Sequence, residues 1–502
     1  MMTLEEVRKT GAGGGYGYRR VPVCRELYSD QYTPLQVLRR LKAVSSHCYL
    51  LESVEDSRQW GRYTFLGYEP AMEIVCRGKK AVITGPDGVR EEKINHPGEV
   101  IRKILREYKS PKVEGMPTFT GGLVGYFSYD YVKYGEPVLQ GNDFLERGEE
   151  TERLSEDEPF PDVDLMLFDK VIAFDQFRQK ILLIDNVRLD DLESDYKRAE
   201  ASLKEMERLI RQGQEAPEEG LRLKREFRPV LTKDEYCAMV EKGKKYILEG
   251  DIFQVVLSNR LEAEMEGSLL NAYRVLRTTN PSPYMFYFSG NVEIAGASPE
   301  TLAKVTDGRI STFPLAGTRP RGKTETEDRM LEKELLLDEK ELAEHNMLVD
   351  LGRNDIGRVS QIGSVKVEKY LGIERYSHVM HIGSTVTGKL RADKDALDAL
   401  DAILPAGTLS GAPKIRACQI IDQLEGGRRG LYGGAVGYLD FSVNMDVCIA
   451  IRLAYARKGK VTVRSGAGIV ADSVPEKEYE ECLNKARAVL NAIDTAGKGE
   501  DL

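Results

Sequence analysis

DLMLFDKVIAFDQFRQKILLIDN, residues 164–186, is the stretch that best indicates how this chain folds. Its apolar runs flank the polar segment DQFRQK, and short apolar runs bounded by polar turns are typical of β-strands. The same pattern appears in GGLVGYFSYDYVKY (121–134) and in short segments between 48 and 90 that Gly, Pro and Asp separate. Residues 190–212 instead have helical spacing, with no Gly or Pro among them. We therefore expect antiparallel strands together with helices.

The length of the chain bounds its domain organisation. At 502 residues it exceeds the usual size of one domain, so two domains or one large intertwined α/β body is expected. The polar segment QGQEAPEEG (212–220) follows a helical stretch and is a candidate linker. We therefore predict an N-terminal β-rich region at 20–211, a linker at 212–227 and a C-terminal region at 228–491.

The chain contains one internal echo. GGLVGY (121–126) and GGAVGY (433–438) agree at five of six positions, and each begins a β-rich stretch. Coincidence between two glycine-led strands and duplication of a β-rich unit would both produce it. The sequence leaves both explanations open.

Composition excludes several classes of function. A formal net charge of -9 provides no basic surface for nucleic acid, which favours a small-molecule substrate. The seven cysteines are scattered without a CxxC pair, so reduced thiols are expected rather than disulfides or a zinc site. No run approaches the roughly 18 apolar residues of a membrane helix, and the N-terminus MMTLEEVRKT lacks the apolar region of a signal peptide. A cytoplasmic protein is expected.

Two helix-like segments carry carboxylates at the same spacing. DEKELAEHNMLVDL (338–351) places Glu341 and Glu344 three residues apart, and PEKEYEECLNKARAVL (475–490) does the same for Glu478 and Glu481. If the two helices face each other, four carboxylates meet, and oxygen ligands of this kind suit Mg²⁺. A solvated helix face is the alternative for each segment. His345 follows Glu344 directly, and the sequence assigns it no role.

Three polar turns are candidates for binding an anion. They are PLAGTRPRG (314–322), GTLSGAPK (407–414) and VRSGAGIVADS (463–473). Backbone N–H groups exposed beside glycine bind carboxylate or phosphate oxygens, and Arg adds a bidentate partner. A histidine of YSHVMHIGSTVTG is a candidate for acid-base work, with an ordinary strand histidine as the alternative.

In their order and spacing these segments resemble the chorismate-utilising enzymes, and in particular the large (component I) subunits of anthranilate synthases. LLES at 50–53 and RYTFLG at 62–67 extend the resemblance into the N-terminal region. The resemblance implies an α+β fold in which two orthogonally packed antiparallel β-sheets are flanked by helices in α/β/β/α layers, with the two regions interleaved in space. The motifs that carry it between 232 and 490 are DIFQVVLSNR, SPE, PLAGTRPRG, DEKELAEHNMLVDLGRNDIGRV, HVMHIGSTVTG, LPAGTLSGAPK, YGGAVGY, IAIR, SGAGIVADS and ECLNKA.

The resemblance also implies a site for chorismate and Mg²⁺. Glu344 and Glu481 match the metal ligands of the family, with Glu341 and Glu478 nearby, and Thr408 matches a residue close to the reacting ring. The residues that match the other chorismate contacts are Gly317, Thr318, Tyr432, Arg452 and the backbone amides of Gly466, Ala467 and Gly468.

The implied reaction is attack of ammonia at C2 of chorismate with loss of the C4 hydroxyl as water, followed by elimination of pyruvate to leave anthranilate. This is the first committed step of tryptophan biosynthesis. Glu341 matches the general acid that protonates the departing hydroxyl, and His381 matches the histidine tied to pyruvate elimination. A divalent cation, an Arg and backbone amides that fix a dianion beside a positioned acid form a coherent site.

Two positions distinguish the reactions within the family. Aminodeoxychorismate synthases have a nucleophilic lysine where this chain has Ala316, and isochorismate and salicylate synthases have a lysine base where it has Gln254. Ammonia is therefore the expected nucleophile. An aminodeoxyisochorismate synthase, which stops before pyruvate loss, is the alternative within the family. A non-catalytic chorismate- or tryptophan-binding regulator is the alternative outside it.

Regulation and partners are likewise implied by the resemblance. Feedback-inhibited members bind tryptophan at positions that match Glu52 and Ser53 and, in NPSPYMF, Pro283, Tyr284 and Met285. No amidotransferase domain is expected in this chain, so ammonia would come from a component II subunit, with a heterotetramer of two large and two small subunits.

Overall fold

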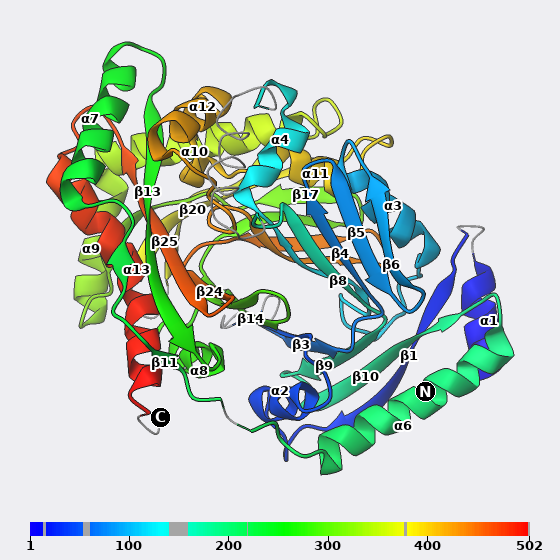
Figure 1. Cartoon of the computed structure of the whole chain (residues 1–502). Helices are drawn as coiled ribbons and strands as arrows, with labels where there is room; N and C mark the ends of the chain where they lie inside the picture. Colours follow the sequence, from blue (N-terminus) through cyan, green and yellow to red (C-terminus); the bar gives the residue numbers. More distant parts are fainter. Residues whose placement is uncertain (14–16, 54–60, 140–158, 218, 376–378, 500–502) are drawn as a thin grey trace.

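The computed structural model describes residues 1–13, 17–53, 61–139, 159–217, 219–375 and 379–499. Over these residues the chain forms one sheet of 13 strands and one of 12, and every pairing between named strands is antiparallel. Helices cover the outer sides of both sheets (Figure 1). These features confirm the α+β class with two antiparallel sheets and flanking helices. Within the described ranges no helix is long and apolar enough to cross a membrane.

The first sheet contains the strand that is central to the candidate site, β25. Two short strands, β12 (Arg228–Pro229) and β21 (Gly411–Ala412), pair with β13 outside the main order. The main order is β1 (Arg20–Tyr28), β10 (Lys180–Arg188), β9 (Lys170–Asp175), β3 (Tyr63–Tyr68), β2 (Cys48–Glu52), β14 (Tyr284–Ser289), β15 (Glu293–Ser298), β24 (Leu453–Arg457), β25 (Lys460–Ile469), β13 (Gln254–Glu266) and β11 (Arg222–Leu223).

The second sheet contributes two strands to the candidate site, β18 and β20. β19 (Lys366–Arg375) pairs with β20 outside the main order. That order is β18 (Leu315–Pro320), β20 (Val379–Lys389), β17 (Arg309–Thr312), β16 (Thr301–Thr306), β23 (Met445–Ile449), β22 (Ala435–Asp440), β7 (Gly122–Phe127), β8 (Val163–Phe168), β4 (Met72–Arg77), β5 (Lys80–Gly85) and β6 (Gly88–Lys93).

The helices divide between the two sheets. In Figure 1, α7 and α13 lie at the left and α3 at the right. The helices are α1 (Leu4–Ala12), α2 (Pro34–Lys42), α3 (Pro97–Glu107), α4 (Val132–Gly135), α6 (Leu192–Gln212), α7 (Lys233–Leu248), α8 (Leu270–Thr279), α9 (Glu325–Leu337), α10 (Glu339–Gly357), α11 (Ala396–Ile403), α12 (Lys414–Glu425) and α13 (Pro475–Gly497).

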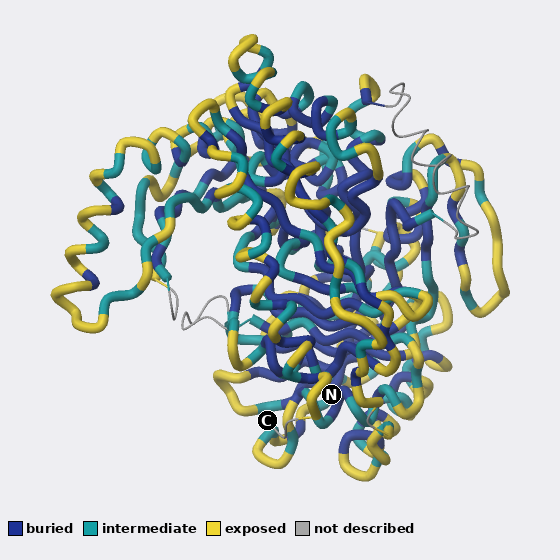
Figure 2. The backbone as a smooth tube through the Cα atoms, turned by 60° about the vertical axis from the view of Figure 1, so that its left-hand side comes forward, coloured by how far each residue is buried: buried dark blue, intermediate teal, exposed yellow. Residues whose placement is uncertain are grey.

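Three apolar layers hold this arrangement together. One packs α2, α6, α8 and α13 on the first sheet, and another packs α3, α10 and α11 on the second. Between the sheets lies an aromatic layer, in which the rings of Tyr49 from β2 and Phe168 from β8 meet edge to face with centroids 4.7 Å apart. Figure 2 shows buried residues gathered through the middle of the molecule, with exposed residues on its outside. Each sheet therefore buries both faces, as its largely apolar strands require.

Each sheet joins one block of strands from before the predicted linker to one block from after it. β2 pairs with β14, and β7 pairs with β22. The second pair brings the two glycine-led repeats together, with Gly125 opposite Gly437. A Cβ on Gly125 would lie 2.1 Å from the carbonyl oxygen of Asp164 on β8, and a Cβ on Gly437 would lie 2.1 Å from that of Asp446 on β23. The echo in the sequence thus marks two neighbouring strands with the same close backbone approach.

The β pattern predicted for 121–134 is correct only for its first half. After β7 the chain forms a 3₁₀ turn at Tyr129–Tyr131 and then α4. Tyr131 and Tyr134, three residues apart, are both buried with their rings 5.4 Å apart. This helical spacing of the tyrosines outweighs the β propensity of the aromatic residues.

Candidate active site

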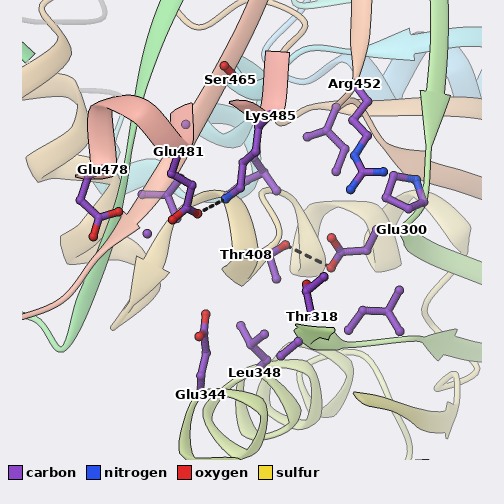
Figure 3. A pocket seen from close by; sticks show the side chains of 18 of the residues that line it. Glu300, Thr318, Glu344, Leu348, Thr408, Arg452, Ser465, Glu478, Glu481 and Lys485 are labelled. Atoms are coloured by element: carbon purple, nitrogen blue, oxygen red, sulfur yellow. Dashed lines mark hydrogen bonds and ion pairs between the residues drawn. The ribbon is translucent and has the colours of Figure 1, made fainter. Parts of the chain in front are cut away.

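A cavity of about 560 Å³ is lined by residues of both sheets and of the helices α10 and α13 (Figure 3). Ala467 is the one predicted site residue of this group outside its wall, because side chains alternate along β25 and its own is fully buried. The predicted residues in the wall are Gly317, Thr318, Glu341, Glu344, His381, Thr408, Tyr432, Arg452, Gly466, Gly468, Glu478 and Glu481.

The helix α10 supplies the first pair of carboxylates. Asp338 caps its N-terminus by accepting hydrogen bonds from the backbone N–H groups of Lys340 and Glu341. The cap fixes the first turn, so that Glu341 and Glu344 reach the cavity. Burial and the neighbouring charge of Glu344 raise the pKa of Glu341 above its ordinary value, and Arg319, 3.8 Å away, opposes the shift.

The helix α13 supplies the second pair from the opposite wall. Glu481 Oε1 lies 2.8 Å from the ammonium group of Lys485, one turn further along the helix. Burial raises the pKa of Glu478, with Glu481 contributing in the same direction. Figure 3 shows both carboxylates across the cavity from Glu344.

These four carboxylates fit Mg²⁺ in the chemistry of their donors. All are oxygen ligands, and the pKa values of Glu341 and Glu478 are raised mainly by burial and further by like charges, which a cation would offset. They do not form a compact cluster: among the described residues no three His, Cys, Asp or Glu side chains are close enough together to hold a metal ion. The carboxylates therefore provide candidate ligands from two walls rather than a preformed cage.

Glu300 is a functional candidate that the sequence reasoning did not assign. It lies in the cavity wall and accepts a hydrogen bond of 3.1 Å from the hydroxyl of Thr408. Burial raises its pKa to about 7, against the opposing effects of Thr408 and Arg452. The SPE motif (298–300), which contributes to the family resemblance, was the available signal for this residue. Lys485 also lies in the wall, and it too was given no role from the sequence.

The other side of the cavity is suited to anions. Arg452 lines it with a backbone φ of 50°, a conformation that residues other than glycine rarely adopt and that is common at functional sites. From Arg464 onward β25 pairs with β13 alone, so alternate backbone N–H groups face away from β13. Gly466 and Gly468 lie in the cavity wall on this segment. Arg452 and these amides together offer donors to carboxylates.

His381 is held in one orientation by β18. Its Nδ1 lies 2.9 Å from the carbonyl oxygen of Gly317 and 3.2 Å from the hydroxyl of Thr318. Burial lowers the pKa of His381, which favours the neutral ring. Because the carbonyl oxygen can only accept, Nδ1 carries the proton and the lone pair lies on Nε2.

The two positions that distinguish reactions within the family, Gln254 and Ala316, both lie in the wall. Gln254 Nε2 is 3.4 Å from Glu344 Oε1, and its Oε1 is buried without a hydrogen-bond partner among the described residues. Two lysines line the cavity elsewhere, Lys340 on α10 and Lys485 on α13. Neither occupies the place of the family's lysine nucleophile or lysine base.

The residues predicted to bind tryptophan lie outside this cavity but next to one another. Glu52, at the end of β2, pairs in register with Met285 of β14, and Ser53 follows it. Glu52 accepts hydrogen bonds from the hydroxyl of Tyr273 and the guanidinium of Arg277. The hydroxyl of Tyr284 donates to Asp446 at 2.8 Å, and Pro283 is buried beside it.

Comparisons with known proteins find relatives that match nearly the whole chain. Component 1 of anthranilate synthase from Acetivibrio thermocellus is 45% identical over 505 residues, and that from Pseudomonas aeruginosa is 46% identical over 507, each covering 99% of both chains. The crystal structure of anthranilate synthase component I from Streptococcus pneumoniae TIGR4 has a TM-score of 0.73 at 34% identity, covering 92% of this chain and 99% of that one.

A more distant structure shares the fold. The menaquinone-specific isochorismate synthase of Escherichia coli has a TM-score of 0.67 at 19% identity, with 98% of each chain covered. A family model described as chorismate binding enzyme matches residues 46–491. This match and the full-length relatives lead to one conclusion: the chain belongs to the chorismate-binding enzyme family.

Proposed function

We propose that this chain is the large subunit of an anthranilate synthase, which converts chorismate and ammonia into anthranilate, pyruvate and water. The observation that carries the proposal is the cavity wall around Gln254 and Ala316. An amide and a methyl group stand where other members of the family place a lysine base or nucleophile, and neither can activate water or form a covalent adduct. The similarity to component 1 subunits over the full chain supports the same activity.

Substrate binding follows from the charges of the cavity. Arg452 and the amides around Gly466 and Gly468 would hold one carboxylate of chorismate, with the ring between them and Thr408. Glu344 and Glu481 would hold Mg²⁺, with Glu341 and Glu478 close by. When bound, the cation would neutralise the second carboxylate of the substrate and withdraw electron density from the ring.

The departing C4 hydroxyl needs a proton to leave as water. The family resemblance assigns this role to Glu341, whereas the electrostatics of the cavity favour Glu300. A pKa of about 7 keeps a large fraction of Glu300 protonated at neutral pH, and the Thr408 hydroxyl fixes one of its oxygens. We infer that Glu300 gives its proton to the hydroxyl, while Glu341 contributes to holding the cation.

Loss of pyruvate completes the reaction. The C2 proton leaves, the bond between C3 and the enolpyruvyl oxygen breaks, and the ring becomes aromatic. The neutral ring of His381, with its lone pair on Nε2, is suited to accept that proton. Thr318, which contacts the same ring nitrogen as Gly317, keeps the imidazole in place.

Partners and regulation belong to the same proposal. Ammonia would come from a component II glutamine amidotransferase, in a cytoplasmic heterotetramer of two large and two small subunits. Tryptophan would bind at Glu52, Ser53, Pro283, Tyr284 and Met285 and inhibit the reaction. The in-register pairing of β2 with β14 supports this second site, because it places the two motifs side by side.

The test is an assay of the purified chain with chorismate, Mg²⁺ and ammonium. We expect anthranilate, identified by its mass and fluorescence, and no product when glutamine replaces ammonium. Glutamine should support the reaction once a component II subunit is added. Accumulation of aminodeoxyisochorismate would assign the chain to the alternative within the family, and chorismate binding without turnover would indicate a regulator.

A further inference from the structure

His345 directly follows the candidate metal ligand Glu344, yet it is not among the residues that line the cavity. Its side chain is fully buried, and its Nε2 lies 2.7 Å from the hydroxyl oxygen of Ser384. Ser384 belongs to β20, the strand that also carries His381. The contact therefore joins the helix of the candidate acids to the strand of the candidate base.

The partner residue Ser384 sits opposite an irregularity in the neighbouring strand. Between the pairs Lys369–Thr385 and Gly372–Gly383, β19 has two residues, Tyr370 and Leu371, where β20 has only Ser384. Two residues opposing one is the definition of a β-bulge, and bulges recur next to active sites, where they redirect side chains.

The bulge is strained, and the Ser384 hydroxyl stabilises it. Leu371 has a backbone φ of 54°, which is costly for a residue with a branched side chain. Its N–H donates to Ser384 Oγ at 3.1 Å. Because Oγ accepts this bond, its own proton can be donated to His345 Nε2, which completes a chain from α10 to the bulge.

The next residue of the helix makes a parallel contact. The hydroxyl of Tyr370 donates to Asn346 Oδ1 at 2.6 Å. Two consecutive residues of α10 thus hold the two consecutive residues of the bulge. We call this set, His345, Asn346, Ser384, Tyr370 and Leu371, the helix–bulge clasp.

The helix–bulge clasp adjoins the cavity wall, because His345 directly follows Glu344 on α10 and Ser384 shares β20 with His381. Glu341 is four residues before His345, so the two lie on the same side of α10. A Cβ on Gly317 would lie 3.2 Å from Glu341 Oε2, which shows how closely the helix approaches β18. A small shift of α10 would therefore move Glu341 and Glu344 relative to Gly317 and His381.

We propose that His345 is a positioning residue, whose hydrogen bond to Ser384 fixes α10 on the β19 bulge and so sets the positions of Glu341 and Glu344. The metal and substrate part of this inference rests on the proposed function. His345 itself touches neither the substrate nor the cation.

Three variants and one control test the proposal. His345→Phe keeps an aromatic ring but removes the ring nitrogens, His345→Gln keeps a polar group that can reach Ser384, and Ser384→Ala removes the shared hydroxyl. Ser360→Ala is the matched control: Ser360 and Ser384 are both 3% exposed, and the Ser360 hydroxyl has no hydrogen-bond partner among the described residues.

Two measurements separate positioning from a loss of stability. The first is the Mg²⁺ concentration that gives half of the chorismate-dependent rise in melting temperature. Loss of a group that orients a metal ligand costs about 10-fold or more in metal affinity, so we expect this midpoint to rise by that factor in His345→Phe and Ser384→Ala. The second is amide hydrogen exchange, which should accelerate in β19 and in the first half of α10.

We expect His345→Gln to lie nearer to the wild type than His345→Phe does in both measurements, and Ser360→Ala to match the wild type. Wild-type exchange in both segments of His345→Phe and Ser384→Ala, or equal defects in His345→Gln and His345→Phe, would overturn the proposal. Hydrogen exchange requires no turnover. If the wild-type chain formed no anthranilate, the proposed function would fail while the exchange result still decided whether the clasp holds α10.

Discussion

Thr408 Oγ1 donates a hydrogen bond of 3.1 Å to Glu300 Oε1, although the two residues are 108 positions apart in the sequence. The bond orients a carboxyl whose burial raises its pKa to about 7. A carboxyl of that pKa is a suitable proton donor at neutral pH, because its protonated form is populated and its proton is readily released.

Glu300→Gln should lower kcat by about 100- to 10,000-fold, the usual contribution of a general acid, with little change in KM. In the wild type, kcat should fall as the pH rises through about 7, because Glu300 then loses its proton. A pH–rate profile with saturating ammonia checks both expectations. Glu341→Gln is the companion variant: if it abolished turnover while Glu300→Gln kept the falling limb, the proton donor would be Glu341.

The same carboxyl should make stability depend on pH. Its folded pKa of about 7 lies above the ordinary value of 4.5, so its stabilising contribution is complete below 4.5 and is lost as the pH rises through 7. Glu300→Gln cannot ionise, so its melting temperature relative to the wild type should be higher at pH 8 than at pH 5. Scanning calorimetry at the two pH values measures this. A constant difference would mean that Glu300 ionises normally.

Removal of a candidate metal ligand should raise the requirement for Mg²⁺. We expect Glu344→Gln and Glu481→Gln to increase the half-saturating Mg²⁺ concentration by about 10- to 100-fold or more. Glu480→Gln, which changes the exposed neighbour of Glu481 on α13, should leave it unchanged. Activity titrations with Mg²⁺ after treatment with a chelator provide the measurement. Equal midpoints in all three variants would contradict the assignment of the metal to these carboxylates.

Ser53→Ala should weaken inhibition by tryptophan without changing the uninhibited rate. Loss of one hydrogen bond to a charged ligand group costs about 1.5–3 kcal/mol, which predicts a rise in the inhibitory concentration of roughly tenfold or more. Ser46→Ala, two residues before the start of β2, is the control. Tryptophan titrations of the ammonium-dependent activity measure the effect. No inhibition of the wild type at millimolar tryptophan would remove the site from the proposal.

Gly437→Ala should destabilise the centre of the second sheet. A Cβ there would lie 2.1 Å from the carbonyl oxygen of Asp446, and the backbone φ of 155° is also unfavourable for alanine. We expect a loss of about 2–4 kcal/mol in the free energy of unfolding. Gly220→Ala, with no atom within 4 Å of the added Cβ, should be close to neutral. Denaturant titrations compare the two, and equal stabilities would contradict the close approach of β22 and β23.

Much of the fold follows from local patterns in the sequence. Antiparallel strands and helices were predicted from such patterns, whereas the two-sheet arrangement with flanking helices and the family were implied by the resemblance of ordered motifs; all are confirmed. The error at 129–134 arose because buried tyrosines suit both a strand and a helix, and packing decides between them. The roles of the predicted site residues stay predictions, although the structure brings those assigned to chorismate and Mg²⁺, except Ala467, to the wall of one cavity.

The sequence by itself determined the chemical groups that this protein can use: the two Glu-x-x-Glu helices, the glycines of β25, and the amide and methyl groups at Gln254 and Ala316. The tertiary structure decided how those groups behave. The pKa of Glu300 depends on how completely distant segments exclude water, and the role proposed for His345 depends on a bulge that forms only when β19 pairs with β20. Solvation and register are properties of contacts between remote residues, so no local pattern could specify them.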